Sequence, residues 1–374
     1  MQQHVHSRTL RSAVAHIITA VIGAGVLSLA WSTSQLGWIA GPVSLLLFAI
    51  VTYISSFLLS DCYRTPDPVS GKRNYSYMDA VRVYLGSKRT YLVGFLQYLT
   101  LYGTCIAYVI TTASCIRAIL KSNCYHKEGH KAPCKYVDTL YLMLFGVVQI
   151  VMSFIPDLHN MAWVSVVAAL MSFTYATIGL GLGITTVIEN GRIMGSITGV
   201  AASNTLEAPP SENKTMKKAS MIAIFITTFF YLCCGCFGYA AFGDQTPGNL
   251  LTGFGFYEPY WLIDFANACI VLHLIGGYQM VPKKIPKQTT YVVSTTGLGI
   301  LFLYFNQVLG VLGAISFWPL AIYFPVEMYF VQKKIEAWSR KWIVLRIFGF
   351  VCFLVPVFGL IGSLEGIISA KLSS

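Results

Sequence analysis

Residues 15–31 read AHIITAVIGAGVLSLAW, and this stretch decides the fold. Apolar residues continue as far as Ile22, a Gly-Ala-Gly triplet follows at 23–25, and the apolar run resumes at Val26. Such a run is typical of a helix that crosses a membrane, although glycine weakens a helix interior. Two explanations are open. Either the helix is unwound beside a cavity, or the small residues let another helix pack closely against it.

An unwound stretch in the middle of a membrane has a specific chemical use. It exposes backbone N–H groups on one side and carbonyl groups on the other. An amino acid zwitterion needs both, because its carboxylate accepts hydrogen bonds and its ammonium donates them. Under this explanation the predicted substrate-binding residues are Ile22, Gly23, Ala24, Gly25 and Val26.

The composition of the whole chain predicts a membrane protein. Of its 374 residues, 55% are hydrophobic and only 11% are charged, whereas soluble domains have about 25% charged residues. The apolar residues gather in runs long enough to cross a hydrocarbon core of about 30 Å. The net charge of +11 is scattered between these runs, which is typical of cytoplasmic loops and argues against nucleic acid binding.

The hydropathy pattern predicts an all-α polytopic membrane protein with about ten spans in a single transmembrane domain, 1–374. The predicted spans are 12–36, 39–61, 91–120, 137–155, 162–188, 219–242, 259–281, 289–305, 308–331 and 343–368.

Charge predicts how the spans are oriented, because cytoplasmic loops are enriched in Lys and Arg. Loop 61–90 is rich in both and is predicted to be cytoplasmic, which makes 121–136 external. In the second half, the Lys-rich segments near 214–218, 283–287 and 333–341 are predicted to be cytoplasmic and 243–258 external.

Two cysteines support the external assignment of 121–136. Cys124 and Cys134 flank this polar loop, and a disulfide between them would be stable outside the cell. The four lysines of the loop argue mildly for the other side. The alternative is a pair of free thiols in a cytoplasmic loop.

The orientations that charge predicts for the two halves of the chain conflict at segment 189–218. The fifth span is predicted to end outside and the sixth to begin inside, so this segment must cross the membrane. Its most apolar part, 193–202, is too short for a spanning helix, and Pro209-Pro210 ends any helix. Either one half is inverted, or a span that belongs here is absent.

A few ionisable residues lie inside apolar runs, where they are functional candidates. His16 and His273 titrate near physiological pH and are candidates for proton coupling. The alternative for each is a neutral histidine that is hydrogen-bonded to a neighbouring helix. Asp264 and Asn267 lie one turn apart on the same predicted helix as His273, so Asp264 is a third candidate. The alternative for Asp264 is a position near the outer membrane interface, where a charged carboxylate costs little free energy.

Other motifs carry little chemistry. The CCGC cluster at Cys233–Cys236 has no partner at zinc-site spacing, so packing is favoured over a metal site. Sequons at Asn74 and Asn213 fall in loops predicted to be cytoplasmic, where glycosylation is not expected. The sequence has no phosphate-binding loop, nucleophile elbow or H-E-x-x-H motif, so neither an enzyme nor a cofactor or metal is predicted.

Long stretches of the chain resemble a known family. AHIITAVIGAGVLSLAWSTSQLGWIAGP (15–42), HNMAWVSVVAALMSFTYATIGLGLGI (159–184) and YFNQVLGVLGAISFWPLAIYFPVEMYF (304–330) are similar to plant amino acid permeases of the amino acid/auxin permease family, as is the run from CCGCFGYAAFGD (233–244) to HLIGGYQ (273–279). The resemblance covers most of the chain.

The resemblance implies a LeuT-like inverted-repeat fold and a proton-driven amino acid symporter of the plasma membrane. Its partners would be amino acids, protons and the lipid bilayer. The broken first helix and a broken sixth helix would hold the substrate, with Tyr102 and Tyr108 of the third span as candidates for its wall. His16 and His273 coincide with histidines that the family shares in its first and eighth helices.

The chain departs from the family pattern of eleven helices. The sixth helix is expected between about Val200 and Pro209 and is missing there, which is where the charge parity fails. A cytoplasmic loop is shortened at 282–288. Two functional hypotheses follow: an amino acid symporter, or a truncated, non-transporting or interfering membrane protein derived from an amino acid permease.

Overall fold

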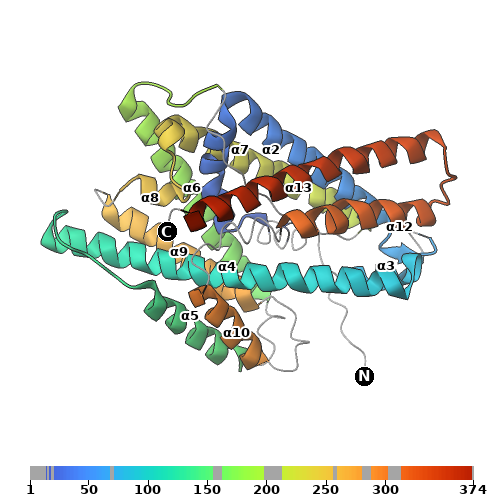
Figure 1. Ribbon diagram of the computed structural model, residues 1–374, viewed down its shortest axis with the longest axis horizontal. Coiled ribbons are helices and arrows are strands. Elements are labelled where there is room, and N and C mark those ends of the chain that lie inside the picture. The colour runs from blue at the N-terminus through green and yellow to red at the C-terminus, as the bar shows by residue number, and fades with distance from the viewer. Residues whose placement is uncertain are drawn as a thin grey trace.

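The computed structural model is a helical bundle with one two-stranded hairpin (Figure 1). The structure describes residues 14 and 17 and the ranges 21–67, 71–154, 162–197, 213–255, 259–279, 288–301 and 313–372. Within these ranges, seven helices are long and apolar enough to cross a membrane. The prediction of an all-α polytopic membrane protein is therefore confirmed.

The first described element is a distorted helix. The 3₁₀ turn η1 (Ala24–Ser28) leads into α2 (Leu29–Asp61), which bends sharply at Gly37, where φ is 75°. A Cβ on Gly41 would lie 2.7 Å from Cγ2 of Thr33, so the chain folds back on itself at this bend. The two predicted spans 12–36 and 39–61 therefore meet at a glycine kink, without a separating loop.

The remaining predicted spans overlap other helices, whose ends differ from the predicted ones. The longest is α4, which continues beyond the predicted 91–120 at both ends because its terminal turns are polar and hydropathy detects only apolar turns. The helices are α4 (Ser87–Glu128), α5 (Asp138–Ser153), α6 (Ala162–Asn190), α7 (Asn213–Phe242), α9 (Tyr260–Gln279), α10 (Gln288–Leu301), α12 (Phe324–Gln332) and α13 (Arg340–Leu372).

The helices form two groups that meet along α6 and α9. In the first, α2 runs beside α7, and η1 packs against both α6 and α7. In the second, α4 lies against α5, α9 and α10. Figure 1 shows this second group below the first. One buried cluster around Ile22 fills the space between η1, α6, α7 and α9. A second, around Val109 and Tyr278, fills the α4–α5–α9–α10 group.

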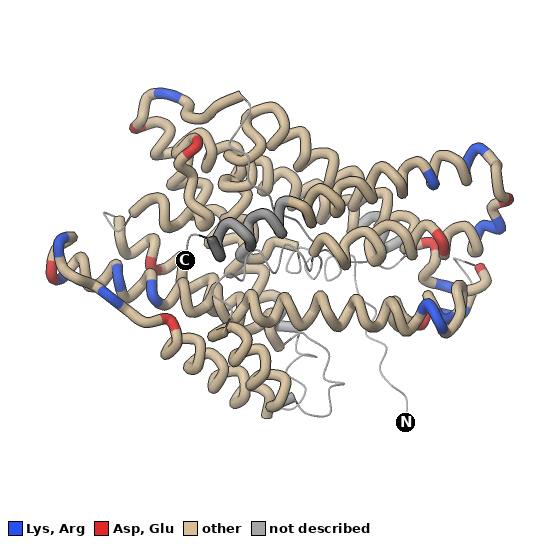
Figure 2. Tube along the Cα trace, in the orientation of Figure 1, with Lys and Arg blue, Asp and Glu red and all other residues tan. Residues whose placement is uncertain are grey.

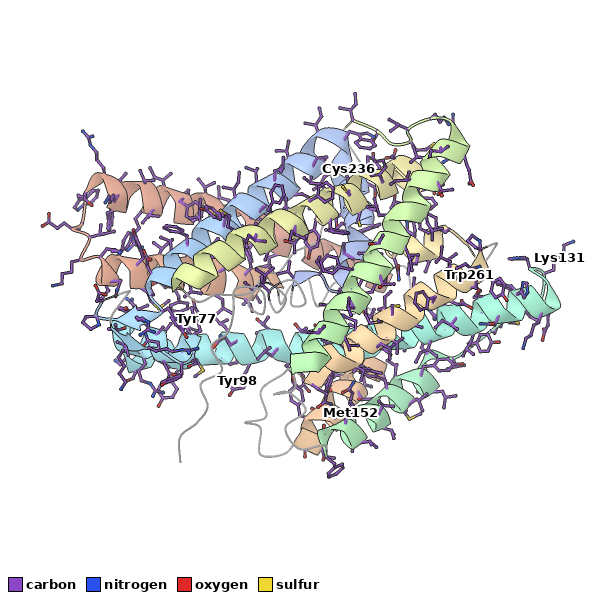
Figure 3. The ribbon with its side chains drawn as sticks, turned by 180° about the vertical axis from the view of Figure 1, so that it is seen from behind. Tyr77, Tyr98, Lys131, Met152, Cys236 and Trp261 are labelled. Atoms are coloured by element: carbon purple, nitrogen blue, oxygen red, sulfur yellow. A yellow bond between two sulfur atoms is a disulfide. The ribbon has the colours of Figure 1, made fainter. Side chains whose placement is uncertain are left out.

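Charged residues gather at the two ends of the bundle, and the middle is almost free of them (Figure 2). Figure 3 shows Tyr77 and Lys131 near opposite ends of the long helix α4. At the Lys131 end, the ring of His126 stacks on Tyr260 at 4.0 Å, and Asn123 donates to a carboxylate oxygen of Asp264 at 2.8 Å. Loop 121–136 and the start of α9 therefore share one end, as expected for two external segments.

In the structure Cys124 and Cys134 form a disulfide across loop 121–136, with their Cα atoms 6.1 Å apart. The pair closes a loop between the end of α4 and the start of α5. Arg117 pairs with Asp138 at 2.5 Å and links the same two helices.

The opposite end has a small cap that hydropathy did not predict. It consists of the hairpin β1 (Arg64–Thr65) and β2 (Lys72–Arg73) and the short helix α3 (Tyr77–Leu85). Ser76 caps α3 by accepting a hydrogen bond from the amide of Asp79 at 3.0 Å. Burial raises the pKa of Tyr84 to about 12, so its hydroxyl stays protonated and donates to the carbonyl of Arg64.

The sequon residue Asn74 is buried inside this cap. Its side-chain nitrogen donates to the carbonyl of Cys62 and to the hydroxyl of Thr65, both at 3.0 Å. Because the amide that a glycan would need is already engaged and covered, the geometry agrees with the prediction that Asn74 is not glycosylated.

The helices α6 and α7 run in the same direction, although they follow each other in the chain. Asn190, the last residue of α6, donates to the carbonyl of Ala241 near the end of α7, at 2.9 Å. Met194 also bonds to the end of α7, through Ala240 at 2.9 Å, and Ser196 bonds to Tyr239. The chain must therefore return to the far end of α7 through residues 198–212, which lie outside the described residues.

The helical stretch 313–332 contains a π-helical turn, η4 (Pro319–Tyr323), before α12. Pro325 has no N–H, so it cannot donate to the carbonyls of Leu320 and Ala321 that precede it by five and four residues. Tyr77 of α3 donates to Leu320 instead, at 2.8 Å, and Ser55 of α2 donates to Ala321. The wide turn is thus paired by side chains from two other helices.

Candidate substrate site

The first helix is unwound at the glycine triplet. Gly23 has extended backbone angles of φ −97° and ψ −175°. Its own N–H bonds to the carbonyl of Val21 at 2.9 Å, and Val26 N–H bonds to Gly23 at 3.1 Å, where a continuous helix would pair Val26 with Ile22. The structure therefore has the break that the first explanation of this stretch predicts.

Two tyrosines pair the carbonyl groups that the break releases. Tyr175 of α6, which is fully buried, donates to the carbonyl of Ile22 at 3.2 Å. Tyr231 of α7 donates to the carbonyl of Val21. An unpaired carbonyl at this depth costs several kcal/mol, so these hydroxyl groups stabilise the unwound backbone and attach it to two different helices.

His273 of α9 lies beside the break. A Cβ on Gly23 would come within 4.0 Å of its Nε2 atom. Its Nδ1 atom lies 3.1 Å from the carbonyl of Ala168 and 2.9 Å from the hydroxyl oxygen of Ser172. The carbonyl only accepts, and Ser172 donates its own proton to that same carbonyl. Nδ1 is therefore the protonated nitrogen of the neutral ring, and Nε2 is the basic nitrogen beside Gly23.

The structure brings some predicted site residues to the break and places others elsewhere. Ile22 and Val26 are buried in the same cluster against which Tyr108 packs, while Gly25 is exposed. Tyr102 packs edge-on against Tyr291 of α10, with ring centres 5.3 Å apart, and does not belong to that cluster. For Ala24 only the backbone is described.

One of the other two proton-coupling candidates, Asp264, lies away from this site. Asp264 lies nine residues before His273 on α9, about 13 Å away along the axis, and it bonds to Asn123 of α4. His16 lies outside the described residues.

The two capping tyrosines and Ser172 were not identified from the sequence. Tyr175 and Tyr231 follow Ile22 by more than 150 residues, and nothing in the local pattern joins them. The one available signal was general: a buried tyrosine in an apolar helix needs a partner for its hydroxyl group.

The predicted packing role of the CCGC cluster agrees with the geometry. Cys234 is buried on α7, and a Cβ on Gly235 would lie 3.0 Å from Thr33 of α2. Among the described residues, no group of three His, Cys, Asp or Glu side chains is arranged to hold a metal ion.

A multi-pass helical bundle with an unwound helix and a basic histidine nitrogen beside it defines a membrane protein of the transporter class. Comparison with known proteins agrees. The family profile described as "Transmembrane amino acid transporter protein" matches residues 6–203, 195–287 and 283–369. The chain therefore belongs to this transporter family, which is not a family of enzymes.

Curated relatives come from Arabidopsis thaliana. "Probable amino acid permease 7" is 52% identical over 437 aligned positions, covering 97% of this chain and 94% of the relative. "Amino acid permease 3" is 46% identical, covering 96% and 90%. The first alignment is longer than the chain of 374 residues, so at least 63 of its positions hold no residue of this chain. The family match is interrupted near 195–203 and 283–287.

Proposed function

We propose that this chain is a proton-coupled amino acid symporter of the plasma membrane. The observation that carries the proposal is the position of His273 Nε2 beside the unwound backbone at Gly23. This arrangement places an imidazole nitrogen that can bind a proton beside backbone groups that suit an amino acid. The names of the relatives support amino acids as the substrate class.

In this proposal the carboxylate of the substrate binds at the N–H side of the break, near Gly25. The carbonyl side is less free than the sequence suggested. The carbonyl of Val21 already accepts from Gly23 and Tyr231, which uses both of its lone pairs, and Ile22 accepts from Tyr175. One lone pair of the Ile22 carbonyl is left for the ammonium group, and the family's sixth helix would supply the further acceptors that this group needs.

A proton on Nε2 of His273 would add a positive charge beside the bound carboxylate. Proton and substrate would then stabilise each other, which is the physical basis of coupling. The membrane potential would help to drive the charged complex inward, at about 2.3 kcal/mol per charge per 100 mV.

Uptake of radiolabelled amino acids into a transport-deficient cell tests the proposal, at external pH of about 5.5 and about 7.5. We expect faster uptake at the lower pH and loss of this difference in His273→Gln. The matched control is His130→Gln, a histidine exposed in the external loop. Absence of pH-dependent uptake by correctly localised protein would refute the symporter, and unchanged pH dependence in His273→Gln would refute the role of that residue.

The parallel course of α6 and α7 favours a second candidate, a non-transporting protein. From Tyr239, which bonds to Ser196, back to Asn213 is about 39 Å along α7. A helix made of residues 198–212 would cover only about 23 Å at 1.5 Å per residue. Residues 198–212 are therefore too few for a spanning helix, although the charge parity requires this segment to cross the membrane.

Restoring the segment separates the two candidates. The aligned residues that a full-length relative has between the positions of Val200 and Pro209 are inserted here, and uptake is compared with that of the original chain. Uptake by both forms supports the symporter. Uptake only after insertion supports the non-transporting protein, and tags placed in loops 121–136 and 333–341 report whether both halves keep their expected sides.

A further inference from the structure

The loop between α12 and α13 holds a tryptophan out of the fold. Trp338 is 78% exposed, although its ring lies 5.2 Å from that of Trp342. Among the described residues, the only non-glycine residues with positive φ are Lys334, at 48°, and Trp338, at 67°. Both lie in this one loop of seven residues, Lys333–Ser339, so the backbone here is held in a conformation that these side chains disfavour.

Hydrogen bonds at the two helix ends explain how the loop keeps this shape. At the end of α12, Ile335 N–H bonds to Phe330 at 3.0 Å and Lys334 N–H bonds to Val331 at 3.3 Å. This is a Schellman motif, in which lysine occupies the left-handed position that glycine favours. At the start of α13, the hydroxyl oxygen of Ser339 accepts from Trp342 N–H at 3.4 Å. Trp338 directly precedes this cap and has little freedom to turn inward.

The position of the loop along the bundle puts Trp338 at a membrane surface. Apolar spans reach Gln332 on one side of the loop and begin again at Arg340 on the other. Large apolar side chains next to the loop, Val331 and Val344, are exposed as expected for contact with lipid. Tryptophan is enriched at this boundary because its ring is apolar and its N–H is polar.

The basic residues of the loop are exposed around Trp338. Within the described part of the chain, no ion pair is formed by Lys334, Arg340 or Lys341. The carboxylates of this end are engaged elsewhere: Asp61 pairs with Lys333 at 3.5 Å, and Glu327 pairs with Arg346 at 2.6 Å. Glu336 is the one acidic residue of the loop. Figure 2 shows the basic residues at the turn between α12 and α13.

We propose that the loop Lys333–Ser339, together with Arg340 and Lys341 at the start of α13, binds anionic phospholipid headgroups of the cytoplasmic leaflet, with Trp338 inserted among them. The cytoplasmic leaflet is the negatively charged one, and it attracts Lys and Arg side chains near its surface. The charge of the loop fits this partner, and Trp338 supplies the apolar contact that anchors the loop at headgroup depth. The proposal does not depend on transport activity.

Lipid-dependent quenching of Trp338 fluorescence tests this. The full chain is placed in phosphatidylcholine nanodiscs that contain roughly 30% phosphatidylserine, a typical anionic fraction, and either lipid carries bromine near the headgroup end of its acyl chains. The signal of Trp338 is the difference between the chain and its Trp338→Phe variant. We expect brominated phosphatidylserine to quench it more than brominated phosphatidylcholine does at the same mole fraction, and this preference to fall as salt is added.

Two matched variants decide whether the loop itself causes the preference. The triple variant Lys334→Gln, Arg340→Gln, Lys341→Gln should lower the affinity for phosphatidylserine by at least about tenfold. The external triple variant Lys127→Gln, Lys131→Gln, Lys135→Gln removes as many charges at the other end and should leave the preference intact. Circular dichroism checks that both remain folded. Equal quenching by the two lipids overturns the proposal. No quenching by either also overturns it, because Trp338 would then lie away from the lipid. An equal effect of the two triple variants also overturns it.

Discussion

The hydroxyl groups of Tyr175 and Tyr231 provide a quantitative test of how the unwound helix is stabilised. In Tyr175→Phe the carbonyl of Ile22 loses the partner that the structure gives it. In Tyr231→Phe the carbonyl of Val21 keeps the bond from Gly23 N–H. The first change therefore leaves a buried acceptor unpaired, and the second removes one of two bonds.

These two situations differ in energy. Leaving a buried acceptor unpaired costs about 1–3 kcal/mol, whereas a hydrogen bond contributes about 0.5–1.5 kcal/mol net. Local opening of the segment around the break should become easier by these amounts. At 1.4 kcal/mol per factor of ten, amide exchange of residues 24–28 should accelerate about 5- to 150-fold in Tyr175→Phe and about 2- to 12-fold in Tyr231→Phe.

Hydrogen–deuterium exchange with mass spectrometry of the purified chain measures this without requiring transport. The matched control is Tyr77→Phe, which removes a similar bond from a tyrosine to a helix carbonyl at the end of the bundle that holds α3. It should accelerate exchange near η4 and leave residues 24–28 unchanged. The reasoning is wrong if Tyr175→Phe leaves exchange around the break unchanged, or if Tyr77→Phe accelerates it equally.

Three further changes test other parts of the fold. Gly238→Val should lower the thermal stability of the chain in detergent, because a Cβ there would meet Ala30 and lie 2.9 Å from Leu250. Gly181→Ala, where a Cβ would meet no described atom within 4 Å, should change the free energy of unfolding by less than about 1 kcal/mol. Cys124→Ser should destabilise the chain by about 2–3 kcal/mol, as expected for opening so short a loop, and a reductant should then lower the unfolding midpoint of the original chain only. Endoglycosidase treatment should leave the gel mobility of the original chain equal to that of Asn74→Gln, since the Asn74 side chain is buried and bonded.

The positions of the helices followed from hydropathy, and their ends did not. Each predicted span contains helix in the described part of the chain because about twenty apolar residues have few alternatives in a bilayer. Hydropathy failed where the helix is polar, as in the last turns of α4, and where the structure is too short to have an apolar run, as in β1, β2 and α3.

The break itself was readable from the sequence, but its supports were not. Two glycines in an apolar run are a local signal, and Gly23 does adopt the extended backbone that they permit. Tyr175, Tyr231 and His273 reach the break only because α6, α7 and α9 converge on it. Such convergence depends on the packing of helices far apart in the chain. The role of His273 as a proton-coupling residue stays a prediction, and so does the LeuT-like form of the fold.

The parallel course of α6 and α7 and the surroundings of the break are two separate observations that bear on the proposed missing segment. Among the described residues, the Ile22 side of the break is covered by α6, α7 and α9, while Gly25 is exposed and has no atom within 4 Å of where a Cβ would be. Backbone at this depth is tolerated only against protein or in a water-filled cavity. A helix placed between α6 and α7 would restore the alternation of directions, and under the resemblance to the permeases it would face the first helix. The missing segment proposed above would account for both the parallel pair and the exposed side of the site at Gly25, which makes its reinsertion the decisive experiment on transport.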